Sequence, residues 1–189
     1  MTIPNFITIA RLVAVPFIVW LMIRDLYLLA AVAFAIAGIS DAVDGFIAKH
    51  YRQASVLGGY LDPLADKVLL VSVFVTLGFK GVLPLWLILL AVSRDFLIVG
   101  GVILSWMLEH PVKMRPLWVS KFNTAAQIVL IALALGERAG LTGFKPYIWI
   151  GIVVVAASTV LSAASYLRQW VRHMSDSKPS DLEIQGDGK

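Results

Sequence analysis

The sequence predicts an all-α integral membrane protein that folds as a single bundle of six transmembrane helices. Hydrophobic residues make up 59% of the chain and charged residues only 15%, with a mean hydropathy of +0.85. In a soluble domain about 25% of the residues are charged. Apolar runs of roughly the 20 residues that a helix needs to cross the hydrocarbon core recur along the whole chain, and no ten-residue segment alternates as a barrel strand would.

Each expected helix corresponds to one apolar run, and Gly or Pro marks most of the connections. The first run begins almost at Met1 with no small-residue cleavage site after it, so we expect a retained helix and not a signal peptide. In chain order the six runs are Phe6–Ile23, Leu26–Lys49, Tyr60–Phe79, Val82–Leu108, Lys121–Leu135 and Phe144–Arg168. The marked connections contain Gly58 with Gly59, Gly81 with Pro84, Pro111 with Pro116, and Gly140 to Pro146.

Basic residues predict the orientation of the bundle. An even number of spans places both termini on one side, and that side carries the larger set of cations: Lys49, Arg52, Lys113, Arg115, Lys121, Arg168, Arg172 and Lys178, against Arg24, Lys80, Arg138 and Lys145. The positive-inside rule then puts the termini in the cytoplasm, and we expect a bacterial inner membrane. Residues 1–173 are expected to form the membrane domain and residues 174–189 a polar, disordered tail.

Four aspartates interrupt this apolar chain. Asp41 and Asp44 fall at the cytoplasmic end of the second expected helix, and Asp62 and Asp66 at the start of the third. Spacings of i,i+3 and i,i+4 place both carboxylates of a pair on one helix face. Because an aspartate deep in a membrane helix costs about 2.5 to 3.5 kcal/mol, something must compensate them. An all-carboxylate cluster favours a hard divalent ion, Mg²⁺ or Mn²⁺, and two such ions would balance four carboxylates.

Small residues beside the aspartates leave room for a ligand. Gly45, Ala48 and Gly58 would let a phosphorylated group approach the backbone, although each alone is equally consistent with close helix packing.

At this point the stretch resembles the signature of the CDP-alcohol phosphatidyltransferases, D-x2-D-G-x2-A-R-x8-G-x3-D-x3-D. Seven of its eight specified positions are met, and Lys49 stands where the family usually has arginine. Lysine keeps the charge but loses the bidentate fork that suits phosphate. The opening "IPNFITIARLVAVPFIV" is also similar to the first helix of the branch that synthesises lipids.

The resemblance implies an activity: transfer of the phosphatidyl group of CDP-diacylglycerol to an alcohol, with release of CMP. It implies that the four aspartates surround the two metal ions, that Asp66 also acts as general base, and that Gly45, Ala48, Lys49 and Gly58 contact the CDP-lipid. It further implies a homodimer of six-helix subunits with the active site at the cytoplasmic face.

The acceptor is a narrower expectation. Arg94 and Asp95 in the fourth helix and "SKFNT" in the fifth resemble the CMP-forming cardiolipin synthases, and we assign Arg94, Lys121 and Asn123 to the acceptor. Arg94 could instead form a structural ion pair, and Lys121 could be an interfacial anchor. Because Asn123 replaces a further cation, we favour phosphatidylglycerol over glycerol 3-phosphate, which stays open as the alternative.

A divalent-cation transporter is the rival from another class of function, since intramembrane carboxylates can form an ion path. The aspartates cluster at one face only, and the far halves of their helices carry no charge. Both observations disfavour a path across the membrane.

Overall fold

The computed structural model describes residues 3–51, 56–107 and 118–176, and within them the side chains of residues 9–40, 64–100, 118–169 and 171. This part of the chain forms α-helices and contains no strand, as the sequence predicts. The helices are α1 (Ile3–Ile23), α2 (Tyr27–Tyr51), α3 (Val56–Phe79), α4 (Leu85–Met107), α5 (Trp118–Arg138) and α6 (Lys145–Asp176).

Most helices extend beyond the apolar runs that predict them, and in α3 and α6 the extension changes an expected boundary. α3 begins at Val56, so Gly58 and Gly59 belong to its first turn and do not separate it from α2. α6 continues to Asp176, because helical hydrogen bonding does not stop where the apolar run gives way to polar residues. Helix α6 therefore enters the segment expected to be a tail, and residues 177–189 lie outside the described part of the chain.

Three helices end in the same type of turn. After α1, α3 and α5, one residue adopts a left-handed conformation: Asp25 (φ 59°), Gly81 (φ 66°) and Gly140 (φ 94°). At the end of α3, the Gly81 amide bonds to the Gly78 carbonyl at 2.9 Å and the Val82 amide to the Leu77 carbonyl at 2.9 Å, which is the Schellman arrangement. Glycine adopts this conformation without steric cost, which is why the sequence signals two of the turns and misses the one at Asp25.

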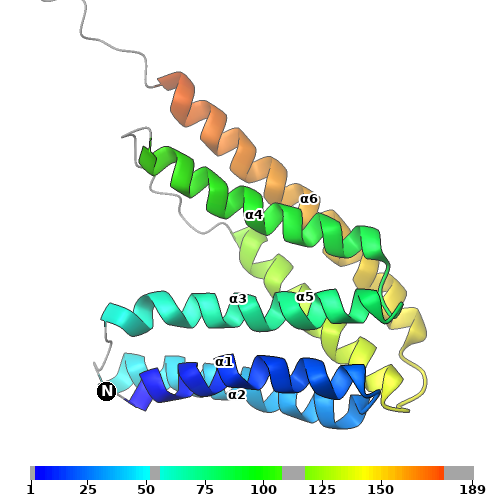
Figure 1. Ribbon diagram of the computed structural model, residues 1–189. Helices are drawn as coiled ribbons and strands as arrows, with labels where there is room; N and C mark the ends of the chain where they lie inside the picture. The colour runs from blue at the N-terminus through cyan, green and yellow to red at the C-terminus, as the bar shows by residue number, and fades with distance from the viewer. Residues whose placement is uncertain (1–2, 52–55, 108–117, 177–189) are drawn as a thin grey trace, which may run out of the picture.

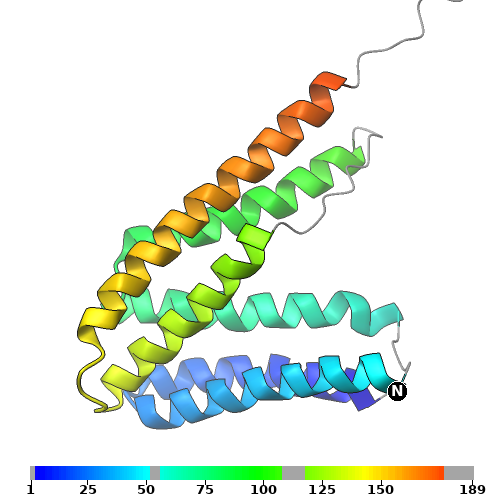
Figure 2. The ribbon, with the colours of Figure 1, turned by 180° about the vertical axis from the view of Figure 1, so that it is seen from behind.

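The six helices form two groups that meet at one end. α1, α2 and α3 run side by side, while α4 and α6 are inclined to them and diverge from them away from the α3–α4 turn (Figures 1 and 2). α5 packs against both α6 and α2 and so connects the two groups. Its buried residues Leu130, Ile131 and Leu135 belong to one continuous core with Phe74 of α3 and Ile18 of α1.

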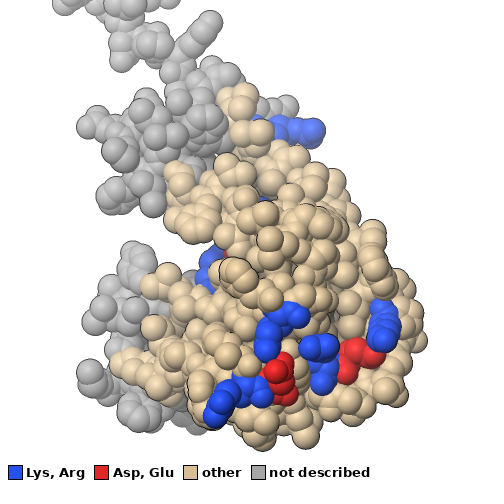
Figure 3. Space-filling model, turned by 45° about the vertical axis from the view of Figure 1, so that its right-hand side comes forward, with Lys and Arg blue, Asp and Glu red and all other residues tan. Residues whose placement is uncertain are grey.

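The outer surface of the bundle is apolar. Large hydrophobic side chains such as Phe79, Phe96, Trp149 and Val153 are exposed on several helices, and soluble monomers rarely expose extended apolar patches. On the face shown in Figure 3, most charged side chains gather toward one end of the molecule, and most of the flank is uncharged. This distribution suits a surface that contacts lipid along its length.

Two helices within the described residues are long and apolar enough to cross a bilayer, namely Trp118–Arg138 and Lys145–Gln169. The described apolar stretches Ile9–Ile23 and Tyr27–Ser40 are shorter.

Charged side chains tie the helix ends together near the α1–α2 and α5–α6 turns. Lys80 at the end of α3 pairs with Asp25 at 2.8 Å and donates to the Ile23 carbonyl at 3.1 Å. The Arg138 guanidinium lies 5.0 Å from the centre of the Tyr27 ring. These contacts hold the turns that join α1 to α2 and α5 to α6 against their neighbours.

Candidate active site

The backbone places the four aspartates on two consecutive helices. Asp41 and Asp44 lie in the second half of α2, and Asp62 and Asp66 lie in the first half of α3, on either side of the α2–α3 connection. The predicted pairs are therefore helical, with their i,i+3 and i,i+4 spacings intact. Of these four, only the side chain of Asp66 is described. The side chains of Asp41, Asp44 and Asp62, and the surroundings of Gly45, Ala48, Lys49 and Gly58, lie outside the described residues.

Asp66 is accessible and is oriented by a buried cation. Its side chain is 43% exposed, and one carboxylate oxygen accepts a hydrogen bond from the Arg11 guanidinium of α1, whose side chain is only 2% exposed. This ion pair links α1 to α3, and it leaves the Asp66 carboxylate accessible to a ligand. The sequence does not indicate that Arg11 and Asp66 are partners.

A cavity of about 530 Å³ opens beside Asp66. Its walls come from α2, α3 and α5, with Asp95 contributed by α4. Polar side chains, Asp66, Lys67, Asp95 and Thr124, line one part of it. The remainder is almost entirely apolar and is lined by Ala31, Phe34, Ala35, Ala37, Gly38, Ile39, Leu69, Leu70, Ile128, Ala132 and Leu135, with Gln127 between. A volume of this size lies within the roughly 300 to 1,000 Å³ range of small-molecule sites.

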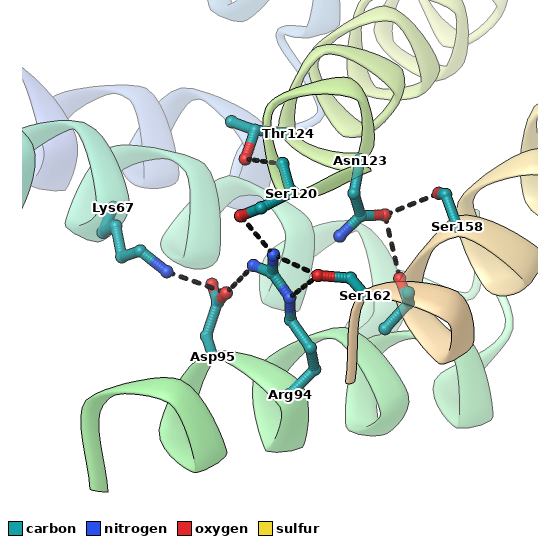
Figure 4. Close-up of polar contacts among 9 residues, drawn as sticks. Lys67, Arg94, Asp95, Ser120, Asn123, Thr124, Ser158 and Ser162 are labelled. Carbon is teal, nitrogen blue, oxygen red and sulfur yellow. Dashed lines mark hydrogen bonds and ion pairs between the residues drawn. The ribbon is translucent and has the colours of Figure 1, made fainter. Parts of the chain in front are cut away.

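Arg94 is buried at the junction of three helices. Its side chain in α4 is held by α5 and α6 (Figure 4): Nη2 donates to Ser120 at 2.5 Å, and both Nε and Nη2 donate to Ser162, at 3.1 and 2.7 Å. Nη1 donates to the neighbouring Asp95 at 2.6 Å. All three guanidinium nitrogens thus have protein partners. Such an arrangement favours the structural ion pair over direct binding of the acceptor.

Asp95 is shared by two cations. The carboxylate oxygen that accepts from Arg94 lies 2.7 Å from Nζ of Lys67 on α3 (Figure 4). Lys67 directly follows the proposed base Asp66 and lines the same cavity. The sequence does not indicate a role for Lys67, because the Asp95 carboxylate that pairs with it comes from a different helix, α4.

The other two acceptor candidates face in different directions. Asn123 is fully buried against α6, where its Oδ1 accepts hydrogen bonds from Ser158 at 2.7 Å and Thr159 at 3.0 Å. Lys121 is exposed, with its ammonium 5.5 Å from the centre of the Trp118 ring. Of the residues assigned to the acceptor, none lines the cavity as described.

No group of three or more His, Asp or Glu side chains within the described residues is close enough to hold a metal ion. Three of the four predicted ligands are not among those side chains, so the metal site stays a prediction. The one ligand that is described, Asp66, presents a half-exposed carboxylate to the cavity. Oxygen donors of this type are the ones that Mg²⁺ and Mn²⁺ prefer.

Comparison with known proteins decides the family. The family model described as CDP-alcohol phosphatidyltransferase matches residues 1–170. The chain belongs to this family. The match confirms the resemblance seen in the aspartate motif, and it extends from α1 through α6.

Relatives of this member of the family carry two different names. The chain is 36% identical over 184 residues to the chloroplastic CDP-diacylglycerol–glycerol-3-phosphate 3-phosphatidyltransferase 1 of Oryza sativa, covering 88% of this chain and 56% of the relative. It is 32% identical over 181 residues to human cardiolipin synthase (CMP-forming), covering 87% and 60%. The chain therefore spans less than two thirds of these two relatives. A Salmonella choleraesuis CDP-diacylglycerol–glycerol-3-phosphate 3-phosphatidyltransferase is 31% identical over 177 residues, and here the match covers 88% of this chain and 91% of the relative.

Proposed function

We propose that this protein transfers the phosphatidyl group of CDP-diacylglycerol to an alcohol acceptor and releases CMP. The proposal rests on the Asp66 carboxylate. Asp66 is the last aspartate of the family's motif, and it lines a cavity that has a polar part and an apolar part. A lipid with a charged head and acyl chains requires that combination. Membership of the phosphatidyltransferase family leaves the rival cation transporter without support.

Asp66 acts in this proposal as the general base. It takes the proton of the acceptor hydroxyl while the oxygen forms its bond to phosphorus and the bond to CMP breaks. Arg11 keeps the carboxylate oriented through their ion pair. Asp41, Asp44, Asp62 and Asp66 would hold two Mg²⁺ or Mn²⁺ ions, which would neutralise the charge on the pyrophosphate. Gly45, Ala48, Lys49 and Gly58 would border the CDP moiety.

The favoured acceptor is phosphatidylglycerol. Among the described charged groups that line the cavity, Asp66 and Asp95 are negative and Lys67 is positive, and Lys67 is already paired with Asp95. A doubly charged phosphate monoester would meet little positive charge there. Phosphatidylglycerol, whose phosphate is a diester with a single charge, suits such a lining better.

Glycerol 3-phosphate stays as the second candidate. The Salmonella relative, whose length the match covers almost entirely, has a name that specifies this acceptor. Arg94 and Asn123 would then contribute through the groups they position, because both lie in helix interfaces. Lys121, which is exposed, would contribute its charge.

The setting of the reaction is also part of the proposal. We infer that all six helices cross a bacterial inner membrane, with the aspartates at the cytoplasmic face, and that two subunits associate. The apolar flank supports the membrane crossing. The excess of basic residues on the terminal side supports the cytoplasmic position of the aspartates. The homodimer rests on the family resemblance alone, and native mass spectrometry of the purified protein tests it.

The experiment supplies purified protein with CDP-diacylglycerol, Mg²⁺ or Mn²⁺, and either acceptor, and measures CMP and the lipid product. We expect cardiolipin from phosphatidylglycerol. Asp66→Asn should lose activity by at least the factor of about 10² to 10⁴ typical of a general base, whereas Asp25→Asn, at the opposite end of the bundle, should not. Product from glycerol 3-phosphate alone would support the second candidate. CMP release by a folded Asp66→Asn protein at the original rate would exclude Asp66 as the base.

A further inference from the structure

The lining of the cavity beside Asp66 changes from polar to apolar along its length. Asp66, Lys67, Asp95 and Thr124 form its polar part, and on α5 the lining continues through Gln127 and Ile128 to Ala132 and Leu135. At about 1.5 Å per residue, Gln127 lies about 4.5 Å, slightly less than one helical turn, beyond Thr124. The order along α5 is therefore one hydroxyl, then one amide, then hydrocarbon, and the charged groups of α3 and α4 lie at the hydroxyl end.

Gln127 has an unmet hydrogen-bonding requirement. Its side chain is only 4% exposed, and its amide nitrogen has no hydrogen-bond partner among the described residues. Buried polar groups almost always have a partner, and each exception calls for an explanation. Because Gln127 lines the cavity, its missing acceptor can be supplied by whatever the cavity holds.

The wall opposite α5 is shaped for a hydrocarbon chain. Ala31, Ala35 and Gly38 of α2 lie on one helix face, at i, i+4 and i+7. A Cβ atom built on Gly38 would meet nothing within 4 Å. Between Ala31 and Gly38 this face carries no polar side chain, and it runs from the second turn of α2 toward Asp41 and Asp44, where the pyrophosphate is expected.

We propose that Gln127 donates a hydrogen bond to a glycerol-ester carbonyl of the CDP-lipid, and that the acyl chain attached there lies in the apolar part of the cavity. The inference rests on the proposed function. Phosphate, ester and alkyl chain follow one another in the lipid in the same order as charged groups, amide and hydrocarbon in the cavity. Gln127 then sets the depth at which the donor lipid binds, and so places its phosphorus opposite Asp66.

An ether analogue of the CDP-lipid tests this contact directly, because it lacks the ester carbonyl and otherwise closely resembles CDP-diacylglycerol. We would measure KM and kcat for CMP release from CDP-diacylglycerol and from CDP-dialkylglycerol of equal chain length, at saturating phosphatidylglycerol. We expect the wild-type KM to be about 2- to 10-fold lower for the ester, the size of one neutral hydrogen bond. In Gln127→Met, which keeps the length of the side chain, the two KM values should be equal. Ser165→Ala, which removes only a hydroxyl bonded to its own helix at 2.7 Å, should keep the wild-type ratio.

Equal KM values for ester and ether in the wild-type enzyme would overturn the proposal and would indicate that a buried water satisfies Gln127. This comparison decides the matter even if Gln127→Met does not fold. An unchanged ester preference in a folded Gln127→Met protein would also overturn it. Absence of CMP release from both lipids with either acceptor would instead refute the proposed function on which the inference rests.

Discussion

Replacing Arg94 by methionine tests whether this residue holds the helices together or binds the acceptor. The guanidinium makes four hydrogen bonds, to Ser120, to Asp95 and two to Ser162, and the side chain is 3% exposed. Methionine fills much of the same volume but supplies no donor. The substitution therefore removes the bonds that join α4 to α5 and α6 with little change in packing.

The expected loss of stability is large. A net contribution of about 1.5 to 3 kcal/mol for each hydrogen bond to a charged group cannot simply be summed over four bonds to one side chain. Breaking a buried ion pair typically costs about 3 to 5 kcal/mol. Asp95 retains Lys67 as a partner at 2.7 Å, so we expect the lower end, about 3 kcal/mol. At about 2 to 4 °C per kcal/mol for a chain of this length, the melting temperature should fall by roughly 6 to 12 °C.

Thermal unfolding in detergent, followed by tryptophan fluorescence, measures this shift. Arg24→Met is the matched control, because Arg24 is exposed and its guanidinium lies 5.8 Å from the centre of the Trp20 ring. A cation–π contact of this kind contributes about 0.5 to 1 kcal/mol. Arg94→Lys should fall between wild type and Arg94→Met, since an ammonium keeps the charge and loses the fork. An unchanged melting temperature for Arg94→Met, together with a raised KM for the acceptor, would refute the structural role and support acceptor binding.

Three further predictions concern stability. The hydrogen bond from Lys80 lowers the pKa of Asp25 below its usual value of 3.8. The stabilisation by this contact is therefore complete above that value and is lost as the pH falls through the lowered pKa, where the melting temperatures of wild type and Asp25→Asn should converge. Gly81→Ala should destabilise the protein by about 1 kcal/mol, because alanine is strained at the left-handed conformation of Gly81, and an unchanged melting temperature would contradict the turn geometry. Asn123→Leu should cost about 1 to 3 kcal/mol, since it removes the Asn123 acceptor from the buried hydroxyls of Ser158 and Thr159. Ser158 keeps the Val155 carbonyl at 3.1 Å, so a double mutant with Thr159→Val should recover part of that loss.

Much of the fold could be predicted from sequence because helix length and apolar run length are linked by the thickness of a bilayer. Gly81 and Gly140 mark two of the turns, since a left-handed residue favours glycine. Asp25 adopts the same conformation without that signal. The sequence also does not indicate that α3 begins at Val56, because Gly58 and Gly59 suggest a break between helices. A glycine in the first turn lowers the stability of a helix only slightly when tertiary packing holds that helix.

The candidate site, like the fold, could be predicted from the sequence only in part. The spacing of Asp41, Asp44, Asp62 and Asp66 indicates the chemistry, since a family motif is local in sequence. The partners of these groups depend on packing between helices far apart in the chain. Arg11 lies 55 residues from Asp66. No periodicity in either helix specifies that the two will meet.

The position of Arg94 has a consequence for how the protein is assembled. In the proposed six-span arrangement, α4 on its own would carry Arg94 and Asp95 into the bilayer at an insertion cost of about 2.5 to 3.5 kcal/mol for each charge at a helix centre. The hydroxyls that solvate Arg94 belong to Ser120 and Ser162, which are synthesised after it. The ion pair with Asp95 and the earlier Lys67 can offset only part of the cost. In the proposed six-span arrangement, stable insertion of α4 would therefore depend on α5 and α6. A ribosome-bound chain that stops before Ser162 should then be extracted from the membrane more easily than the full chain.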